Sequence, residues 1–337
     1  MTDRDERIAA FLGQSGWGPA RRVPLAGDAS ARRYERLYMD RETAVLMDAP
    51  PGSGEDVGDF LRIGRHLLDL GLSAPQIIAK DEPLGLLLLE DLGDGLFAAL
   101  IKHDKTLELP LYTAAVDTLL HIQSAPPPLN LPDLGPADWA EAAAFAPDWY
   151  AFGATGIRRD TSRFHTVLTE AISDHANRAR VLILRDYHAE NLLWLPNRLG
   201  IRRVGLLDFQ LAQMGQPGYD LVSLCQDARR DVPIALERAM IVRFAAAVGA
   251  NPTEFEVTYA VLGAQRALRI LGVFARLCLV MSKPSYVALI PRVWDQLQRN
   301  LAHPALSKLS QVCQAYLPNP TPEALERIRA QCGRHAP

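Results

Sequence analysis

The chain has 337 residues, is 48% apolar and 22% charged, and carries a formal net charge of −3. This composition excludes a disordered tail, a collagen-like rod and a disulfide scaffold, and the charge balance argues against a nucleic-acid-binding surface. The length predicts two domains or one large bilobal domain. The four cysteines lack CxxC spacing, the N-terminus is polar, and the most apolar stretch, residues 270–281, is too short to span a bilayer. We therefore expect a cytoplasmic protein with no membrane insertion and no disulfide or zinc framework.

The first ninety residues predict a small β-rich unit. A Gly-Asp-Ala-Ser turn, residues 27–30, separates the first two strand candidates, and apolar residues from Val57 to Gly71 follow helical spacing. The expected strands are residues 22–25, 33–38, 43–47, 76–79 and 86–89. The predicted order is three strands, one helix and two strands.

Most of the remaining chain shows helical periodicity. The expected long helices are residues 107–123, 138–150, 161–178, 219–229, 234–248, 254–281 and 285–300, followed by two shorter ones. Three β-like segments, at 181–184, 192–195 and 204–207, interrupt this helical part. Short strands among helices position loop side chains accurately, so we expect the chemistry in this region.

Two motifs lie in that region. Asp186 and Asn191 are five residues apart directly after the first β-like segment, and Asp208 ends the hairpin that follows. Transfer of a γ-phosphoryl group requires a carboxylate that accepts the acceptor's proton, which suits Asp186, and oxygen ligands for Mg²⁺, which suit Asn191 and Asp208. Either motif alone occurs by chance, and a strand-terminal Asp is usually a cap or turn residue. Their order and spacing, after a unit of five strands and a helix, match the signature of protein kinases.

The chain resembles the aminoglycoside phosphotransferase/choline kinase branch of the protein-kinase-like superfamily. Within that branch it is most similar to the bacterial cell-wall N-acetylmuramate/N-acetylglucosamine kinases, which phosphorylate an anomeric hydroxyl. The segments that carry the resemblance are residues 27–34, 47–51, 86–93, 185–187, 207–210, 219–221 and 265–286. It implies a bilobal α+β fold, with an N-terminal lobe at 1–92 formed by a small antiparallel sheet and one helix, and a larger helical lobe at 93–337. It also implies ATP and Mg²⁺ as cofactors.

The resemblance further implies roles for individual residues. Asp186 is the expected catalytic base, and Asn191 and Asp208 are the expected metal ligands. The residues expected at the nucleotide are Gly27, Asp28 and Ser30 in the phosphate-covering turn, Arg32 and Arg33 after it, and Glu90 and Leu92 in the hinge. A plain hairpin turn explains residues 27–30 equally well.

One position departs from the kinase pattern. Where most kinases have a lysine on the third strand, this chain has Met47, and residues 1–79 contain no lysine. Arg32 or Arg33 is expected to take over the phosphate contact, with Glu55, Asp56 or Asp59 as the paired carboxylate. Alternatively, the two arginines only cover the strand with their aliphatic stems.

The acceptor pocket is expected in the helical lobe. Candidate residues for substrate binding are His188, Trp149, Tyr150, Gln265 and Arg269, with Arg266 as a further polar group for an acetamido or carboxylate substituent. Alternatively, these residues have structural roles: the histidine packs within its loop, the tryptophan lies in the core and the arginines lie on a solvated helix face.

Three functions remain open from the sequence. The first is transfer of phosphate from ATP to an amino sugar, with no nucleic-acid partner. The second is a phosphotransferase for an aminoglycoside, choline or another small alcohol, although such cationic guests need carboxylate-rich pockets. The third is a non-catalytic pseudokinase that binds ATP, a possibility raised by the missing lysine.

Overall fold

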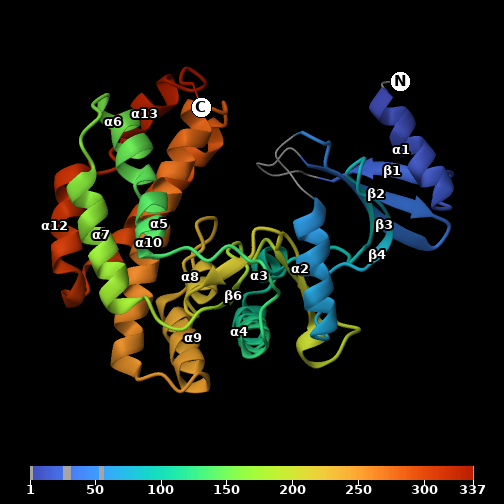
Figure 1. The fold of residues 1–337 in the computed structure, drawn as a ribbon, viewed down its shortest axis with the longest axis horizontal. Helices are drawn as coiled ribbons and strands as arrows, with labels where there is room; N and C mark the ends of the chain where they lie inside the picture. Colours follow the sequence, from blue (N-terminus) through green and yellow to red (C-terminus); the bar gives the residue numbers. More distant parts are fainter. Residues whose placement is uncertain (1–2, 26–31, 53–56, 337) are drawn as a thin grey trace. The chain divides into compact units, whose positions relative to one another are not determined.

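The computed structural model describes residues 3–25, 32–52 and 57–336. The chain divides into two compact units (Figure 1). The first unit contains residues 1–118 and 189–212, and the second contains residues 119–188 and 213–337. These units are discontinuous in sequence, whereas the predicted lobes, residues 1–92 and 93–337, are continuous. The lobe boundary at residue 92 stays a prediction.

The first unit is built on a five-stranded antiparallel sheet with the order β1-β2-β3-β5-β4. Its strands are β1 (Arg21–Pro24), β2 (Arg33–Met39), β3 (Glu42–Asp48), β4 (Ile77–Asp81) and β5 (Leu86–Glu90). The chain between β2 and β3 is so short that the two strands pair along their full length, from Met39↔Glu42 to Arg33↔Asp48. The predicted antiparallel sheet is therefore confirmed.

One face of this sheet is covered by a helix that the sequence reasoning did not identify, α1 (Asp3–Gln14). Its residues Ile8, Phe11 and Leu12 form a core cluster with alternate residues of β3 and β5, such as Leu46 and Leu88. Side chains alternate along a strand, so the intervening residues of β3 and β5 lie on the opposite face.

The helix expected after the third strand is α2 (Val57–Asp69), and the chain leaves it through Gly71, which has a left-handed φ of 75°. The Phe60 ring of α2 stacks on Phe209, with ring centroids 4.9 Å apart. A Cβ atom at Gly64 would lie 3.3 Å from the same ring, so a glycine there lets Phe209 pack closely against α2. This packing fixes the residue that follows Asp208 within the first unit.

The other elements of the first unit are α3 (Phe97–His103), the 3₁₀ turns at Lys105–Leu107 and Gly200–Arg203, and the paired strands β7 (Leu192–Trp194) and β8 (Val204–Leu206). Helix α4 (Glu108–Ser124) crosses the division between the two units.

The second unit is helical apart from β6 (Val181–Ile183) and β9 (Gln213–Gly215), which pair antiparallel. Its helices are α5 (Pro136–Ala143), α6 (Phe152–Thr155), α7 (Ser162–His175), α8 (Tyr219–Cys225), α9 (Ile234–Ala247), α10 (Pro252–Leu279), α11 (Ile290–Leu301), α12 (Ser307–Tyr316) and α13 (Pro322–Ala330). Helix α10 is the central element, because most of its residues are buried and it packs against α5, α7 and α11.

Two of the predicted helices are interrupted. The segment 138–150 divides into α5 and a turn of π-helix at Ala146–Ala151, and 285–300 begins with a 3₁₀ turn at Pro284–Leu289. Each new piece has proline in its first turn, where proline is tolerated because its missing N–H is not needed. Among the described residues, no helix has the length and hydropathy needed to cross a membrane.

Candidate active site

The hairpin of β7 and β8 places Asn191 and Asp208 at the same end. Leu192 pairs with Leu206, and the N–H of Leu207 donates to the carbonyl of Asn191 over 3.0 Å. Asn191 therefore precedes one strand of the hairpin, and Asp208 follows the other by two residues. The two side chains that were predicted to hold a metal come from neighbouring backbone positions of the first unit.

Asp208 is held by two polar neighbours. Gln210 Nε2 donates to Asp208 Oδ1 over 2.6 Å, and Arg32 Nη1 lies 3.8 Å from the same oxygen. Asp208 has a left-handed φ of 55°, an uncommon conformation for a residue other than glycine that the packing of Phe209 helps to maintain. Its side chain is still 44% exposed, so the carboxylate remains accessible to a ligand.

These residues fit a magnesium ion. Mg²⁺ is usually held by one or two protein oxygen ligands together with substrate phosphates and water. Asp208 and Asn191 supply a carboxylate and an amide oxygen at one hairpin end. In the described part of the chain, no group of three or more His, Cys, Asp or Glu side chains is arranged so that it could hold a metal ion.

The structure distinguishes the two arginines that follow the first turn. Arg32 is buried, with its guanidinium near Asp208, whereas Arg33 opens β2 and is exposed. Met47, at the position of the usual lysine, is completely buried. Of the carboxylates proposed as partners, Asp59 pairs with Arg62 in its own helix. Glu55 and Asp56 lie outside the described residues.

The remaining nucleotide candidates lie in part beyond the described chain. Gly27, Asp28 and Ser30 fall outside it. In the expected hinge, the N–H of Glu90 donates to Gln76 O, and the Glu90 carboxylate pairs with Arg198 at 2.5 Å. Leu92 follows β5, and within the described residues its N–H makes no backbone hydrogen bond. The role of Leu92 at the nucleotide stays a prediction.

The loop that carries Asp186 is anchored in the second unit by Asp220 of α8. The Asp220 carboxylate accepts the N–H of Leu184 over 2.6 Å and that of Arg185 over 2.9 Å. Ser223 donates its hydroxyl to Arg185 O over 3.0 Å. Arg185 itself has a left-handed φ of 71°. These contacts fix the backbone immediately before Asp186, whose side chain is half-buried.

A second layer holds this anchor in place. Arg266 of α10 donates to the Ser223 hydroxyl over 3.0 Å and to Gln226 O over 3.1 Å, and all three side chains are buried. Arg266 was a candidate for the acceptor, but in the structure its guanidinium braces α8. The sequence contains no local signal for this contact, because the partners are forty residues apart.

Burial raises the pKa of Asp220 to about 7, although the two backbone N–H donors act in the opposite sense. An acid whose pKa is higher in the folded than in the unfolded protein loses its stabilising contribution as the pH rises. We expect Asp220 to reduce the free energy of unfolding by about 2–3 kcal/mol between pH 5 and pH 8. Urea unfolding of the wild type and Asp220→Asn at several pH values measures this slope, which the variant should lack. Asp174→Asn, at an exposed position, is the control and should keep it.

The predicted acceptor residues occupy different environments. Tyr150 is completely buried and donates its hydroxyl to Pro318 O over 2.7 Å, and Gln265 is buried and donates to Trp139 O over 2.9 Å. Both have the surroundings of core residues. Trp149 is half-buried, with the guanidinium groups of Arg158 and Arg276 each 5.6 Å from its ring centroid.

His188 and Arg269 also differ from each other. His188 is buried, burial lowers its pKa, and its Nε2 lies 3.5 Å from Arg229 Nη1. This environment is that of a loop-packing histidine that remains neutral. Arg269 on α10 is half-buried and keeps part of its surface accessible.

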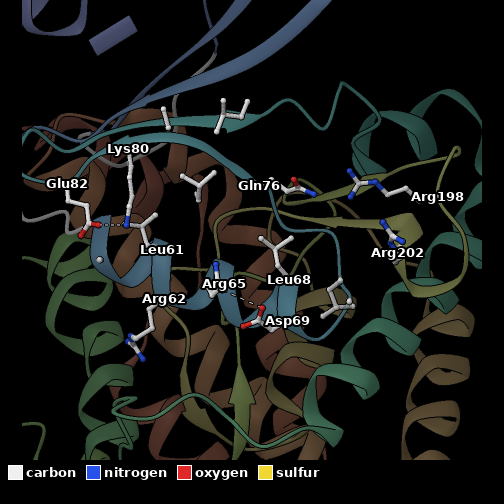
Figure 2. Close-up of a pocket in the computed structure, with 16 residues that line it drawn as sticks. Leu61, Arg62, Arg65, Leu68, Asp69, Gln76, Lys80, Glu82, Arg198 and Arg202 are labelled. Carbon is white, nitrogen blue, oxygen red and sulfur yellow. Dashed lines mark hydrogen bonds and ion pairs between the residues drawn. The ribbon is translucent and has the colours of Figure 1, made fainter. Parts of the chain in front are cut away.

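A large groove in the first unit does not involve these residues. It has a volume of about 1010 Å³ and is lined by α2, β4 and the turn between β7 and β8. Figure 2 shows Leu61 and Leu68 of α2 beneath β4, with Lys80 paired to Glu82 at one end and Arg198 and Arg202 at the other. None of the predicted site residues lines it, so we do not assign the chemistry to this groove.

Comparisons with known proteins identify the family of this chain. The sequence profile of the phosphotransferase enzyme family matches residues 21–257. An N-acetylmuramate/N-acetylglucosamine kinase of Caulobacter vibrioides is 38% identical, covering 94% of this chain and 98% of that protein. A Pseudomonas aeruginosa protein of the same name is 30% identical, covering 91% and 93%.

Solved structures show the same fold. A choline/ethanolamine kinase family protein from Mesorhizobium loti aligns with a TM-score of 0.62 at 14% identity, covering 97% of this chain and 99% of that one. An ADP-bound aminoglycoside phosphotransferase aligns with a TM-score of 0.59 at 14% identity, covering 88% and 97%. The expected α+β kinase-like fold is confirmed, and the chain belongs to the phosphotransferase enzyme family as an ATP-dependent phosphotransferase.

Proposed function

We propose that this enzyme transfers the γ-phosphate of ATP to the anomeric hydroxyl of N-acetylmuramate or N-acetylglucosamine, in the reuse of cell-wall sugars. The observation that carries the proposal is the 38% identity to a kinase named for these two sugars, over nearly the full length of both chains. Similarity of that extent includes the helical part, in which we expect the acceptor pocket.

In this proposal Asp186 is the general base. Its carboxylate accepts the proton of the anomeric hydroxyl as the oxygen attacks the γ-phosphorus, and the phosphoryl group leaves ADP. The anchoring of Leu184 and Arg185 by Asp220 keeps the carboxylate in place, so little reorganisation is needed during the reaction.

Asn191 and Asp208 would hold Mg²⁺, which when bound would neutralise the negative charge that develops on the phosphates. The contact of Gln210 with Asp208 directs the carboxylate. Leu92 would present its N–H to the adenine, and residues 27–30 would cover the phosphates. A cytoplasmic location is part of the same proposal, because ATP is the phosphate donor.

Arg32 would replace the missing lysine, and this assignment yields a paired prediction. Arg32→Ala should raise KM for ATP and lower kcat/KM by about 10–100-fold, because a charge-assisted contact to phosphate is lost. Arg33→Ala is the matched control, since it removes the same side chain from an exposed neighbouring position. Steady-state kinetics with varied ATP measures both. Equal losses in the two variants would show that the arginines only cover the strand.

The other two functions have less support. Choline and aminoglycosides are cations, whereas Arg185 directly precedes Asp186 and Arg269 lies half-buried on α10. A pseudokinase has no physical need to keep Asp186, Asn191 and Asp208 together. Arg32 near Asp208 also supplies a cation where the lysine is missing.

A panel of acceptors tests the proposal. Purified protein with ATP and Mg²⁺ is given N-acetylmuramate, N-acetylglucosamine, kanamycin or choline, and ADP formation is followed. We expect turnover only with the two amino sugars. Turnover restricted to kanamycin or choline, or binding of ATP without turnover on any acceptor, would contradict the proposed function.

A further inference from the structure

Two arginines of the second unit, Arg185 and Arg269, have no carboxylate partner in the described part of the chain, and both belong to segments joined by hydrogen bonds: Arg185 directly precedes Asp186, and Arg269 lies one helical turn after Arg266, which donates to the Ser223 hydroxyl that itself donates to Arg185 O. Among the described residues, no ion pair within 4.0 Å is found for either guanidinium, and the buried Nε of Arg185 has no hydrogen-bond partner. Burial lowers the pKa of Arg185, and the charge of Arg269 lowers it further. The hydrogen bonds from Arg266 through Ser223 to Arg185 place the turn of α10 that carries Arg269 beside the loop of Asp186, so the two positive charges act on each other.

The nearby carboxylates do not neutralise this pair. Both oxygens of Asp220 accept backbone N–H groups, of Leu184 and Arg185, and not the guanidinium. The charges of Tyr219, Asp186 and Asp220 favour the charged form of Arg185, but burial and the charge of Arg269 outweigh them and lower its pKa. Unpaired positive charge thus remains beside the proposed base.

The position of Arg185 is set by the loop and not by its own side-chain contacts. Asp220 and Ser223 fix both of its backbone polar groups, and its φ of 71° is a left-handed conformation that is unfavourable for a residue other than glycine. Arg269 lies three residues after Arg266, which is braced against α8 on the same helix. Both cations are therefore held by structure that exists before a ligand binds.

Two half-buried cations of this kind favour an anion. Repulsion between them is unfavourable in a partly desolvated place, and an anion that contacts both removes it. A guanidinium binds a carboxylate through two parallel N–H donors, and its charge is kept at all physiological pH values. The same surroundings disfavour a cationic acceptor.

We propose that Arg185 and Arg269 form a carboxylate subsite that binds the acid group of the acceptor, which on the proposed function is the lactyl carboxylate of N-acetylmuramate. The inference rests on that function. N-acetylglucosamine is the same sugar without the lactyl ether, so the two acceptors differ by the group that this subsite binds. The subsite makes the enzyme selective for the acidic sugar.

The test is Arg269→Gln, with the kinetics of both sugars measured at saturating ATP. We expect KM for N-acetylmuramate to rise about 10–100-fold, because a charge-assisted contact is lost. The kcat/KM for N-acetylglucosamine should change less than about twofold. Arg269→Lys keeps the charge without the planar fork and should give an intermediate rise. Arg238→Gln, at an exposed position of α9, is the matched control and should alter neither sugar.

Three results would overturn the inference. Equal losses on both sugars together with a higher KM for ATP would mean that the guanidinium contacts a nucleotide phosphate. No change in the sugar preference of Arg269→Gln would mean that it contacts no acceptor group. A wild-type enzyme that phosphorylates neither sugar would contradict the proposed function itself, and this is seen before any variant is made. Binding of N-acetylmuramate to Arg269→Lys by calorimetry provides the answer should Arg269→Gln fail to fold.

Discussion

Replacement of Asp186 by asparagine is expected to lower kcat by about 10²–10⁴-fold, because the amide cannot accept the proton of the anomeric hydroxyl. Asparagine has the same shape, so KM for ATP and the thermal midpoint should remain near those of the wild type. Sugar-dependent formation of ADP from ATP measures the loss. A ligand-binding assay with ATP confirms that the nucleotide site is intact.

Glu190→Gln is the control for Asp186→Asn. It neutralises an exposed carboxylate four residues later in the same loop and should leave kcat unchanged within about twofold. If Asp186→Asn turned over as fast as the wild type, Asp186 would not be the general base. Equal losses in the two variants would indicate a general effect of charge in the loop.

Asp208→Asn is expected to have the second large effect, a fall in kcat/KM on the order of 10³-fold. The charge that attracts a divalent cation is lost, while an oxygen remains that can accept from Gln210. The Mg²⁺ concentration required for half-maximal activity should rise. Titration of activity with Mg²⁺ at fixed ATP measures both quantities.

Asn191→Ala provides the comparison for the metal site. It removes a neutral oxygen ligand, so its effect on the Mg²⁺ requirement should have the same direction but be smaller than that of Asp208→Asn. If Asp208→Asn lowered activity at an unchanged Mg²⁺ requirement, Asp208 would serve only to hold Arg32 and Gln210.

The sheet of the first unit was predictable because its signals are local. Asp40 and Arg41 are turn residues between the strands expected at 33–38 and 43–47, and the structure pairs these segments as the antiparallel strands β2 and β3. Helix α2 follows from the apolar spacing that begins at Val57 and stops at Gly71. Helix α1 was not predicted, although Ile8, Phe11 and Leu12, which the structure buries, have helical spacing in the sequence.

Elements that depend on distant partners were not predictable. Strand β9 is three residues long, Gln213–Gly215, and exists because it pairs with β6 some thirty residues earlier. The segment 138–150 has one continuous helical pattern. Where it breaks depends on Pro147 and on close packing against α10, where a Cβ at Gly272 would lie 2.1 Å from Phe145 O.

The same contrast applies to the site. The spacing of Asp186, Asn191 and Asp208 is visible in the sequence because it follows the motif order of protein kinases, and their roles stay predictions. The sequence could not distinguish Arg32 from Arg33, since their difference in burial depends on where β2 begins. Tyr150 was a candidate for the acceptor because it is aromatic, but contacts with distant residues such as Pro318 bury it.

The central claim is phosphoryl transfer to the anomeric oxygen of an amino sugar. The most direct measurement is phosphorus and proton NMR of the product formed from N-acetylmuramate, ATP and Mg²⁺. We expect two products, ADP and a single new phosphomonoester whose phosphorus couples to the anomeric proton. A phosphate on any other hydroxyl, or ADP and free phosphate with an unmodified sugar, would contradict it.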